Sequence, residues 1–130
     1  PHRFGAMSTP AQAAWIIQQL GNTARIRIVY DYSHYAFRDL SIADTVQQGQ
    51  KLIAYVAMKD AVQSGDKVSF ALPGETKTID HAAIAHTLAA SGYRGDFCCE
   101  VSGQVSSKPG YDPVSAARAC FENMKAVLPV

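Results

Sequence analysis

Two carboxylates and an imidazole follow short apolar runs of this sequence, in positions where they could do chemistry. Asp31 and His34 come at the end of the alternating run that begins at residue 25, and Glu100 ends a second apolar run that begins at residue 97. Strands of α/β proteins present polar side chains at their C-terminal ends in this way. Such groups can bind a divalent metal or transfer a proton next to a carbonyl. We therefore expect the two runs to contribute halves of one site.

The elements that position these residues are predicted to alternate between helix and strand. Strands are expected from residue 25 to Asp31, over residues 52–58 and over residues 97–101. A long loop that contains a β-like run at Lys67–Ala71 is expected between residues 61 and 79. Each predicted helix follows a residue that can cap its first turn. These cap residues are Thr9, Ser41, Asp80 and Asp112.

Alternating helices and strands predict parallel strands joined by right-handed crossovers. A complete (β/α)8 barrel needs about 250 residues, and this sequence has 130. The sequence therefore predicts either a small open sheet or part of a TIM barrel. The start at Pro1, in what reads as a loop, favours part of a barrel.

Composition narrows the class of protein. With 48% hydrophobic residues, 18% charged residues and a formal net charge of +1, the chain has an ordinary globular composition and no excess charge for a polyanion. No apolar run approaches the roughly 18 residues of a membrane span. The three cysteines, Cys98, Cys99 and Cys120, lack metal-ligand spacing, so we expect them reduced, with Cys98 and Cys99 buried. These features favour a cytoplasmic location.

Six segments of the chain resemble a known family. They are Tyr30–His34, Val56–Asp60, Leu72–Glu75 with Thr78–Asp80, Gly92–Gly95, Glu100–Ser102 and Pro109–Pro113. In this order and spacing they resemble the C-terminal half of the xylose-isomerase-like TIM barrels, and within that superfamily they are closest to the sugar phosphate isomerase/epimerase group. The resemblance implies an α/β fold of the (β/α)8 TIM barrel type, represented by roughly its last three βα units plus one preceding helix. Residues 1–130 would be the C-terminal portion of a single barrel domain.

The resemblance also implies a divalent metal cofactor (Mn, Mg, Co or Zn). The family holds this ion with four side chains at the ends of the fifth to eighth strands. Asp31 and Glu100 match two of these ligands, the fifth-strand Glu would fall before Pro1, and Ala57 stands where the family has its seventh-strand His. Without that imidazole the remaining donors are oxygen-rich, which suits Mg or Mn.

Further roles follow from the resemblance and from strand geometry. Glu100 is the candidate base. Lys59 shares the strand face of Ala57 by the period-two rule, so we expect it to point into the site and supply a positive charge. His34 is expected to bind substrate or metal, and His2 to contact substrate. Each assignment has a structural alternative, such as a loop cap or a surface ion pair, and we expect His81 and His86 to be surface or packing residues.

The function implied is a metal-dependent sugar or sugar phosphate isomerase/epimerase that acts by carboxylate-mediated proton transfer next to a carbonyl. The alternatives are an enolate-type dehydratase or hydroxypyruvate-isomerase-like enzyme, and a degenerate barrel that binds sugar without converting it. The apurinic endonuclease branch is disfavoured, because its zinc site needs more His than the four present and its surface should be basic. We expect a small-molecule sugar ligand, no nucleic acid or membrane partner, homo-oligomers formed through open strand edges, and no activity from the isolated fragment.

Overall fold

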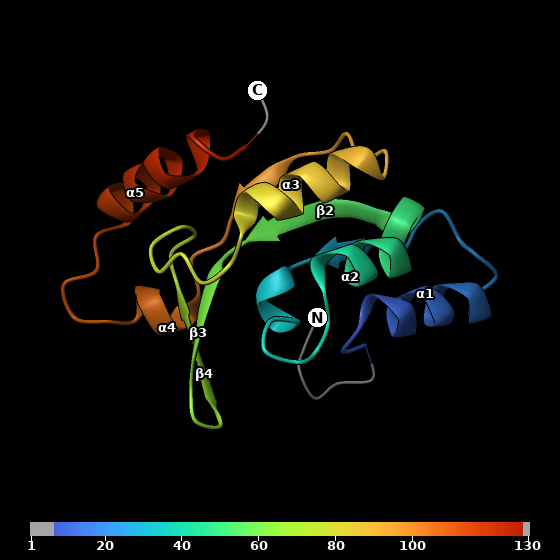
Figure 1. Cartoon of the computed structure of the whole chain (residues 1–130), viewed down its shortest axis with the longest axis horizontal. Helices are drawn as coiled ribbons and strands as arrows, with labels where there is room; N and C mark the ends of the chain where they lie inside the picture. The colour runs from blue at the N-terminus through green and yellow to red at the C-terminus, as the bar shows by residue number, and fades with distance from the viewer. Residues whose placement is uncertain (1–6, 129–130) are drawn as a thin grey trace.

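A parallel sheet of three strands, in the order β1-β2-β5, organises the chain (Figure 1). The computed structural model describes residues 7–128. The strands are β1 (Ile28–Tyr30), β2 (Ile53–Met58) and β5 (Phe97–Cys99). Tyr30 lies opposite Val56, and Val56 lies opposite Phe97. Because the strands are parallel and in this register, the segments that follow them emerge at one edge of the sheet.

Helices connect and cover these strands, and all four predicted caps are confirmed. The longer helices are α1 (Pro10–Gln19), α2 (Ile42–Gly49), α3 (His81–Ala90) and α5 (Pro113–Lys125), and the short ones are α4 (Gly103–Ser106) and the 3-10 turns η1 (Tyr32–His34) and η2 (Gln50–Leu52). Thr9 forms a capping box with Gln12, and Ser41, Asp80 and Asp112 each accept a hydrogen bond from a first-turn backbone N–H.

The long loop predicted between residues 61 and 79 is wrong at its start, which is a strand, whereas the β-like run predicted at Lys67–Ala71 is confirmed. β3 (Asp60–Ser64) and β4 (Lys67–Ala71) pair antiparallel there and form a hairpin that projects from the sheet (Figure 1). The turn consists of Gly65 and Asp66, and Gly65 has a φ of 56°. Two β-like runs separated by a glycine-containing pair of residues are the signal for such a hairpin.

The core lies between the sheet and the helices, and alternation along the strands decides which side chains enter it. Tyr30, Val56 and Met58 are fully buried together with Ile84 and Leu88 of α3. The alternate positions point to the opposite face, where Val29 and Tyr55 are 49% and 40% exposed. Cys98 is on this face and is exposed, which corrects the prediction that it is buried, while Cys99 is half-buried.

Strand boundaries also differ from the prediction: β1 begins at Ile28 rather than at residue 25, and β2 begins at Ile53 rather than at residue 52. β1 ends at Tyr30 because Asp31 caps the 3-10 turn η1, and β5 ends at Cys99, two residues before the predicted end. Among residues 7–128, none of the helices combines the length and apolar character needed to cross a membrane.

Candidate functional site

Asp31 is held in place by the turn that it begins. Its Oδ1 accepts hydrogen bonds from the Ser33 backbone N–H at 3.0 Å and from the Ser33 hydroxyl at 2.6 Å. Both residues are buried. An aspartate commonly accepts a hydrogen bond from the backbone two residues ahead. The turn thus fixes one carboxylate oxygen and leaves Oδ2 for neighbours from other strands.

Lys59 follows β2, and its ammonium group lies between two carboxylates. Nζ is 3.0 Å from Asp31 Oδ2 and 2.7 Å from Glu100 Oε1. It also lies 4.4 Å from the centre of the Phe70 ring on β4, and the residue is only 4% exposed. A buried charge is tolerated when it is paired and hydrogen-bonded, and an aromatic face adds to the attraction. The segments that follow β1 and β5 provide the two carboxylates, and strand β4 of the hairpin provides the aromatic ring.

Glu100 comes directly after β5 and supplies the accessible carboxylate of the site. Its backbone N–H donates to the Met58 carbonyl at 2.9 Å, which continues the pairing of β2 with β5. Its side chain is 44% exposed, whereas that of Asp31 is almost completely covered. The two carboxylates therefore differ: Asp31 holds Lys59 from inside, and Glu100 faces solvent.

His34 completes the cluster on the Asp31 side. Its Nε2 lies 3.3 Å from Asp31 Oδ2 and 3.5 Å from Lys59 Nζ, and its ring packs at 5.4 Å from that of Phe70. The protonation of Nε2 decides whether it donates to the carboxylate or accepts from the ammonium group. Among the residues described, Nδ1 of His34 is buried without a hydrogen-bond partner.

The charges around Asp31 favour its ionised form. Burial acts to raise the pKa of Asp31, but the hydrogen bond with His34, the positive charge of Lys59 and the Ser33 hydroxyl outweigh it, so this pKa lies below its ordinary value. Asp31 is therefore a carboxylate at neutral pH. It is one of two carboxylates that pair with the single ammonium group of Lys59.

The sequence-based prediction thus identifies residues that the structure brings together: Asp31, His34, Lys59 and Glu100. His2 lies outside the described residues. Phe70 and Gln104 were missed. The Gln104 Oε1 accepts the Phe70 backbone N–H at 2.8 Å and so ties β4 to α4 beside the site. An aromatic residue in the predicted loop was the available signal for Phe70, and no local signal pointed to Gln104.

A second polar cluster was also missed. Asp60, which is fully buried, lies 2.6 Å from His81 Nε2 at the start of α3. Its Oδ2 accepts from Thr76 N and Oγ1, both at 2.8 Å, and from Lys77 N at 3.2 Å. These bonds fasten the loop before α3 to the start of β3. The signal in the sequence for this cluster was the pair of adjacent charged residues, Lys59 and Asp60, at the end of a predicted strand. His81, which was expected to be a surface or packing residue, is buried against Asp60.

The donors described here do not fit a divalent metal as they are arranged. Ala57, which the resemblance aligns with a metal-binding His, is buried and has no donor atom. Within residues 7–128, no group of three or more His, Cys, Asp or Glu side chains is placed to hold a metal ion. A divalent ion such as Mg²⁺ needs oxygens at about 2.1 Å, whereas the donors here surround an ammonium nitrogen. Metal binding by the protein stays a prediction.

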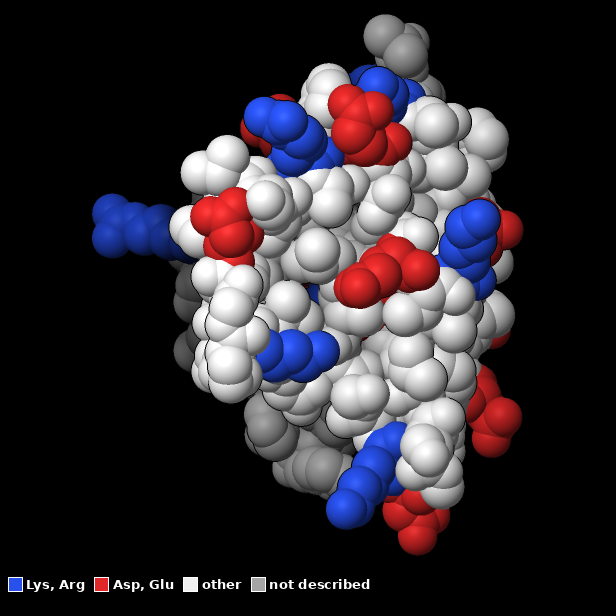
Figure 2. All heavy atoms as spheres, turned by 90° about the vertical axis from the view of Figure 1, so that its left-hand side faces the viewer, with Lys and Arg blue, Asp and Glu red and all other residues white. Residues whose placement is uncertain are grey.

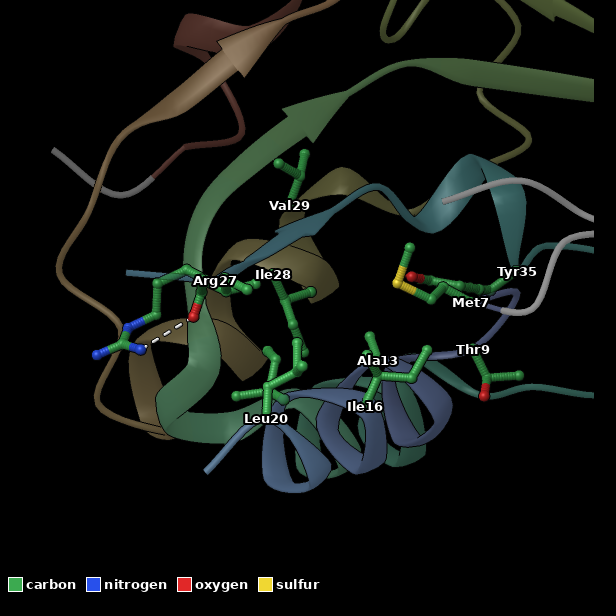
Figure 3. A pocket seen from close by; sticks show the side chains of 11 residues that line it. Met7, Thr9, Ala13, Ile16, Leu20, Arg27, Ile28, Val29 and Tyr35 are labelled. Carbon is green, nitrogen blue, oxygen red and sulfur yellow. Dashed lines mark hydrogen bonds between the residues drawn. The ribbon is translucent and has the colours of Figure 1, made fainter. Parts of the chain in front are cut away.

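Two surface features lie outside this cluster. On the face shown in Figure 2, basic and acidic side chains are interspersed over a largely uncharged surface. A cavity of about 370 Å³ lies between α1 and β1, and Ile16, Leu20, Ile28 and Val29 are among its apolar lining residues (Figure 3). None of the four clustered polar residues lines this cavity. Its lining is suited to packing rather than to acid–base chemistry.

Comparison of the sequence with known protein families gives a match. The sequence matches the family described as Xylose isomerase-like TIM barrel over residues 1–125. The match covers nearly all of the sequence, so the chain belongs to the xylose isomerase-like TIM barrel family, and the predicted resemblance is confirmed. No curated protein matches the sequence.

Proposed function

We propose that the protein is an isomerase or epimerase of a small sugar or sugar phosphate. The observation that carries this proposal is the buried Asp31–Lys59 ion pair with the accessible Glu100 carboxylate at its side. These residues follow three adjacent parallel strands, and the C-terminal strand ends are where TIM barrels carry their active sites. The family includes sugar isomerases and epimerases, which supports the reaction class.

The proposal includes a larger architecture. We infer that residues 1–130 are the C-terminal portion of a single TIM barrel domain, in which β1, β2 and β5 are adjacent strands. The parallel order and the helices between the strands support this arrangement. In such a barrel, Val29, Tyr55 and Cys98 would face the interior, below the layer that holds Asp31, Lys59 and Glu100.

The chemistry assigned to these residues is proton transfer next to a carbonyl. The Glu100 carboxylate removes a proton from the carbon beside the carbonyl of a ketose, and the electrons of the broken C–H bond move to the carbonyl oxygen. A Lys59 N–H stabilises the negative charge that develops there. Return of the proton to the former carbonyl carbon, with transfer of the hydroxyl proton of the first carbon to the former carbonyl oxygen, gives an isomer. Return of a proton to the opposite face of the first carbon gives an epimer.

Asp31 and His34 support this chemistry in different ways. Asp31 fixes the position of the Lys59 ammonium group, because it contributes the buried partner of the ion pair. His34 has a partly exposed ring next to Lys59 and can hydrogen-bond a substrate hydroxyl. Neither residue takes up the migrating proton in this scheme.

The test is incorporation of deuterium from solvent. The full-length protein is incubated in D₂O with ketoses and ketose phosphates, and the carbon-bound hydrogens next to the carbonyl are followed by proton NMR. We expect exchange at one carbon, and a loss of about 10²–10⁴-fold in Glu100→Gln. Glu122→Gln changes an exposed glutamate of α5 and serves as the matched control. No exchange from any member of the panel would contradict the proposal.

A sugar-binding barrel without turnover is the second candidate, and Ala57 favours it. A family position that carries an imidazole ligand has a methyl group here, and that methyl is buried. This candidate predicts saturable binding of a sugar with no exchange of its hydrogens. The same NMR sample distinguishes the two, because binding broadens or shifts ligand signals without replacing hydrogen by deuterium.

A further inference from the structure

The nitrogen of Lys59 lies where the donor atoms of the candidate site converge. It is 2.7 Å from Glu100 Oε1, 3.0 Å from Asp31 Oδ2 and 3.5 Å from His34 Nε2. Asp31 and His34 belong to the segment that follows β1, and Glu100 follows β5, so the donors reach Lys59 from both strands that neighbour β2. A cation at this point attracts both carboxylates and offsets one of their two negative charges, and that cation is an ammonium group that the chain itself supplies.

The spacing of these donors suits an ammonium ion rather than a metal ion. Charge-assisted hydrogen bonds from nitrogen to carboxylate oxygen are about 2.7–2.9 Å long, and metal–oxygen bonds to Mg²⁺ are about 2.0–2.1 Å. A metal ion bound by the same oxygens would also lie beside the positive charge of Lys59, and the two cations would repel each other in a poorly hydrated site.

The surroundings keep Lys59 in this position. The residue is 4% exposed, and the Phe70 ring covers its nitrogen at 4.4 Å. Phe70 is itself held by the hydrogen bond of its backbone N–H to Gln104. Ala57, two positions earlier on the same strand face, is buried and offers no ligand for a competing ion. Moving the ammonium away would leave a buried charge without its partners, which is costly.

We propose that the Lys59 ammonium is the resident cation of this site and holds Asp31 and Glu100 in place of a divalent metal. The inference rests on the proposed function only for what this charge does during the reaction. Its consequence for binding is independent of any substrate: a divalent ion gains access to the two carboxylates when the ammonium group is removed.

Binding of Mn²⁺ tests the inference directly. The full-length protein is freed of metal with a chelator and titrated with Mn²⁺, and free Mn²⁺ is measured by electron paramagnetic resonance. We expect no stoichiometric binding to the unmutated protein, and binding that is at least about tenfold tighter in Lys59→Ala, because a repelling charge has been removed. Lys59→Met keeps most of the side-chain volume beneath Phe70 and provides a second variant. Lys51→Ala, at an exposed lysine before β2, is the matched control and should behave like the unmutated protein.

Two outcomes would overturn the inference. One is stoichiometric Mn²⁺ on the unmutated protein that is lost in Asp31→Ala and Glu100→Ala. The other is absence of any gain in Lys59→Ala and Lys59→Met when circular dichroism shows both variants folded. The titration contains no sugar, so its result is separate from the proposed function. Deuterium exchange that persists in excess chelator would support both, and exchange that requires added Mn²⁺ would support the isomerase while overturning the role of Lys59.

Discussion

The carboxylate of Asp60 lies 2.6 Å from Nε2 of His81, and both side chains are buried. Asp60 is the residue after Lys59, so one dipeptide contributes to two charge clusters. The Lys59 cluster lies at the candidate site, whereas the Asp60 cluster joins β3, the loop before α3 and α3 itself. We therefore expect removal of the Lys59 charge to affect mainly the activity, and removal of the Asp60 charge to affect mainly the free energy of unfolding.

Asp60→Ala is expected to lower the free energy of unfolding by about 3–5 kcal/mol, because it leaves His81 and the amides of Thr76 and Lys77 without their buried acceptor. Urea denaturation followed by circular dichroism measures this change. Asp66→Ala, in the exposed hairpin turn, removes the same charge without a buried partner and should have little effect. A loss in Asp60→Ala no greater than that in Asp66→Ala would refute the structural role.

Stability is expected to fall at acidic pH. Burial acts to raise the pKa of Asp60, but its hydrogen bonds with His81 and Thr76 outweigh it and hold that pKa below the ordinary value, as for Asp31. Depressed pKa values of this kind stabilise the folded state above the unfolded-state pKa of about 3.9. That contribution is lost as the pH falls through the folded-state values. Urea midpoints measured from neutral pH downward should therefore decrease most steeply below about pH 4, and a smaller decrease is expected in Asp60→Asn.

Gly74 and Gly21 have nearly equal positive φ angles but differ in the space around them. Replacing each by alanine therefore distinguishes the cost of a steric clash from the cost of the backbone conformation. Gly74 (φ 75°) would place a Cβ 2.8 Å from the Met124 side chain and 2.9 Å from that of Asn123, whereas Gly21 (φ 76°) has no atom within 4 Å of that position. Gly21→Ala should cost about 1 kcal/mol, the price of a left-handed backbone. Gly74→Ala should cost about 1–3 kcal/mol more, because α5 must shift. Equal losses in thermal or urea unfolding would show that the loop and α5 are not packed as described.

Residues 1–130 on their own are expected to self-associate. The uncovered sheet face exposes Val29 and Tyr55, and an apolar cavity adjoins the β1 edge. Unpaired strand edges and contiguous apolar surface favour association. Size-exclusion chromatography with light scattering should give a mass above that of the 14.0 kDa chain, and Val29→Lys should reduce it. A monodisperse monomer would contradict this expectation.

The helices and strands that are marked by short sequence patterns, such as a capping residue or an alternation of apolar and polar residues, were predictable. Cap residues such as Thr9 and Asp112 marked helix starts, and alternation placed Lys59 on the face of Ala57. Of the β3–β4 hairpin, the β-like run at Lys67–Ala71 was predictable, whereas β3 was missed because polar residues make up much of it. Cys98 was misjudged because burial depends on what covers a sheet face, and that is a tertiary property.

The site was predictable in its residues and only partly in its interactions. Asp31 and Glu100 could be identified because both follow apolar strands. That Lys59 bridges them depends on the register of β2 with its two neighbours, and the Phe70 ring reaches Lys59 only through the hairpin. No spacing in the sequence encodes contacts between residues 41 positions apart, such as that of Lys59 with Glu100.

The alternation of Lys59 and Asp60 also makes the site sensitive to the length of β2. Side chains along a strand point to opposite faces in turn, so deletion of one residue between Ile53 and Met58 would reverse every direction that follows. Asp60 would then take the place of Lys59 and face Asp31 and Glu100, while Ala61 would take the place of Asp60 opposite His81. Such a deletion keeps every charged residue of the protein, yet it would place three carboxylates together at the candidate site and leave His81 without its acceptor.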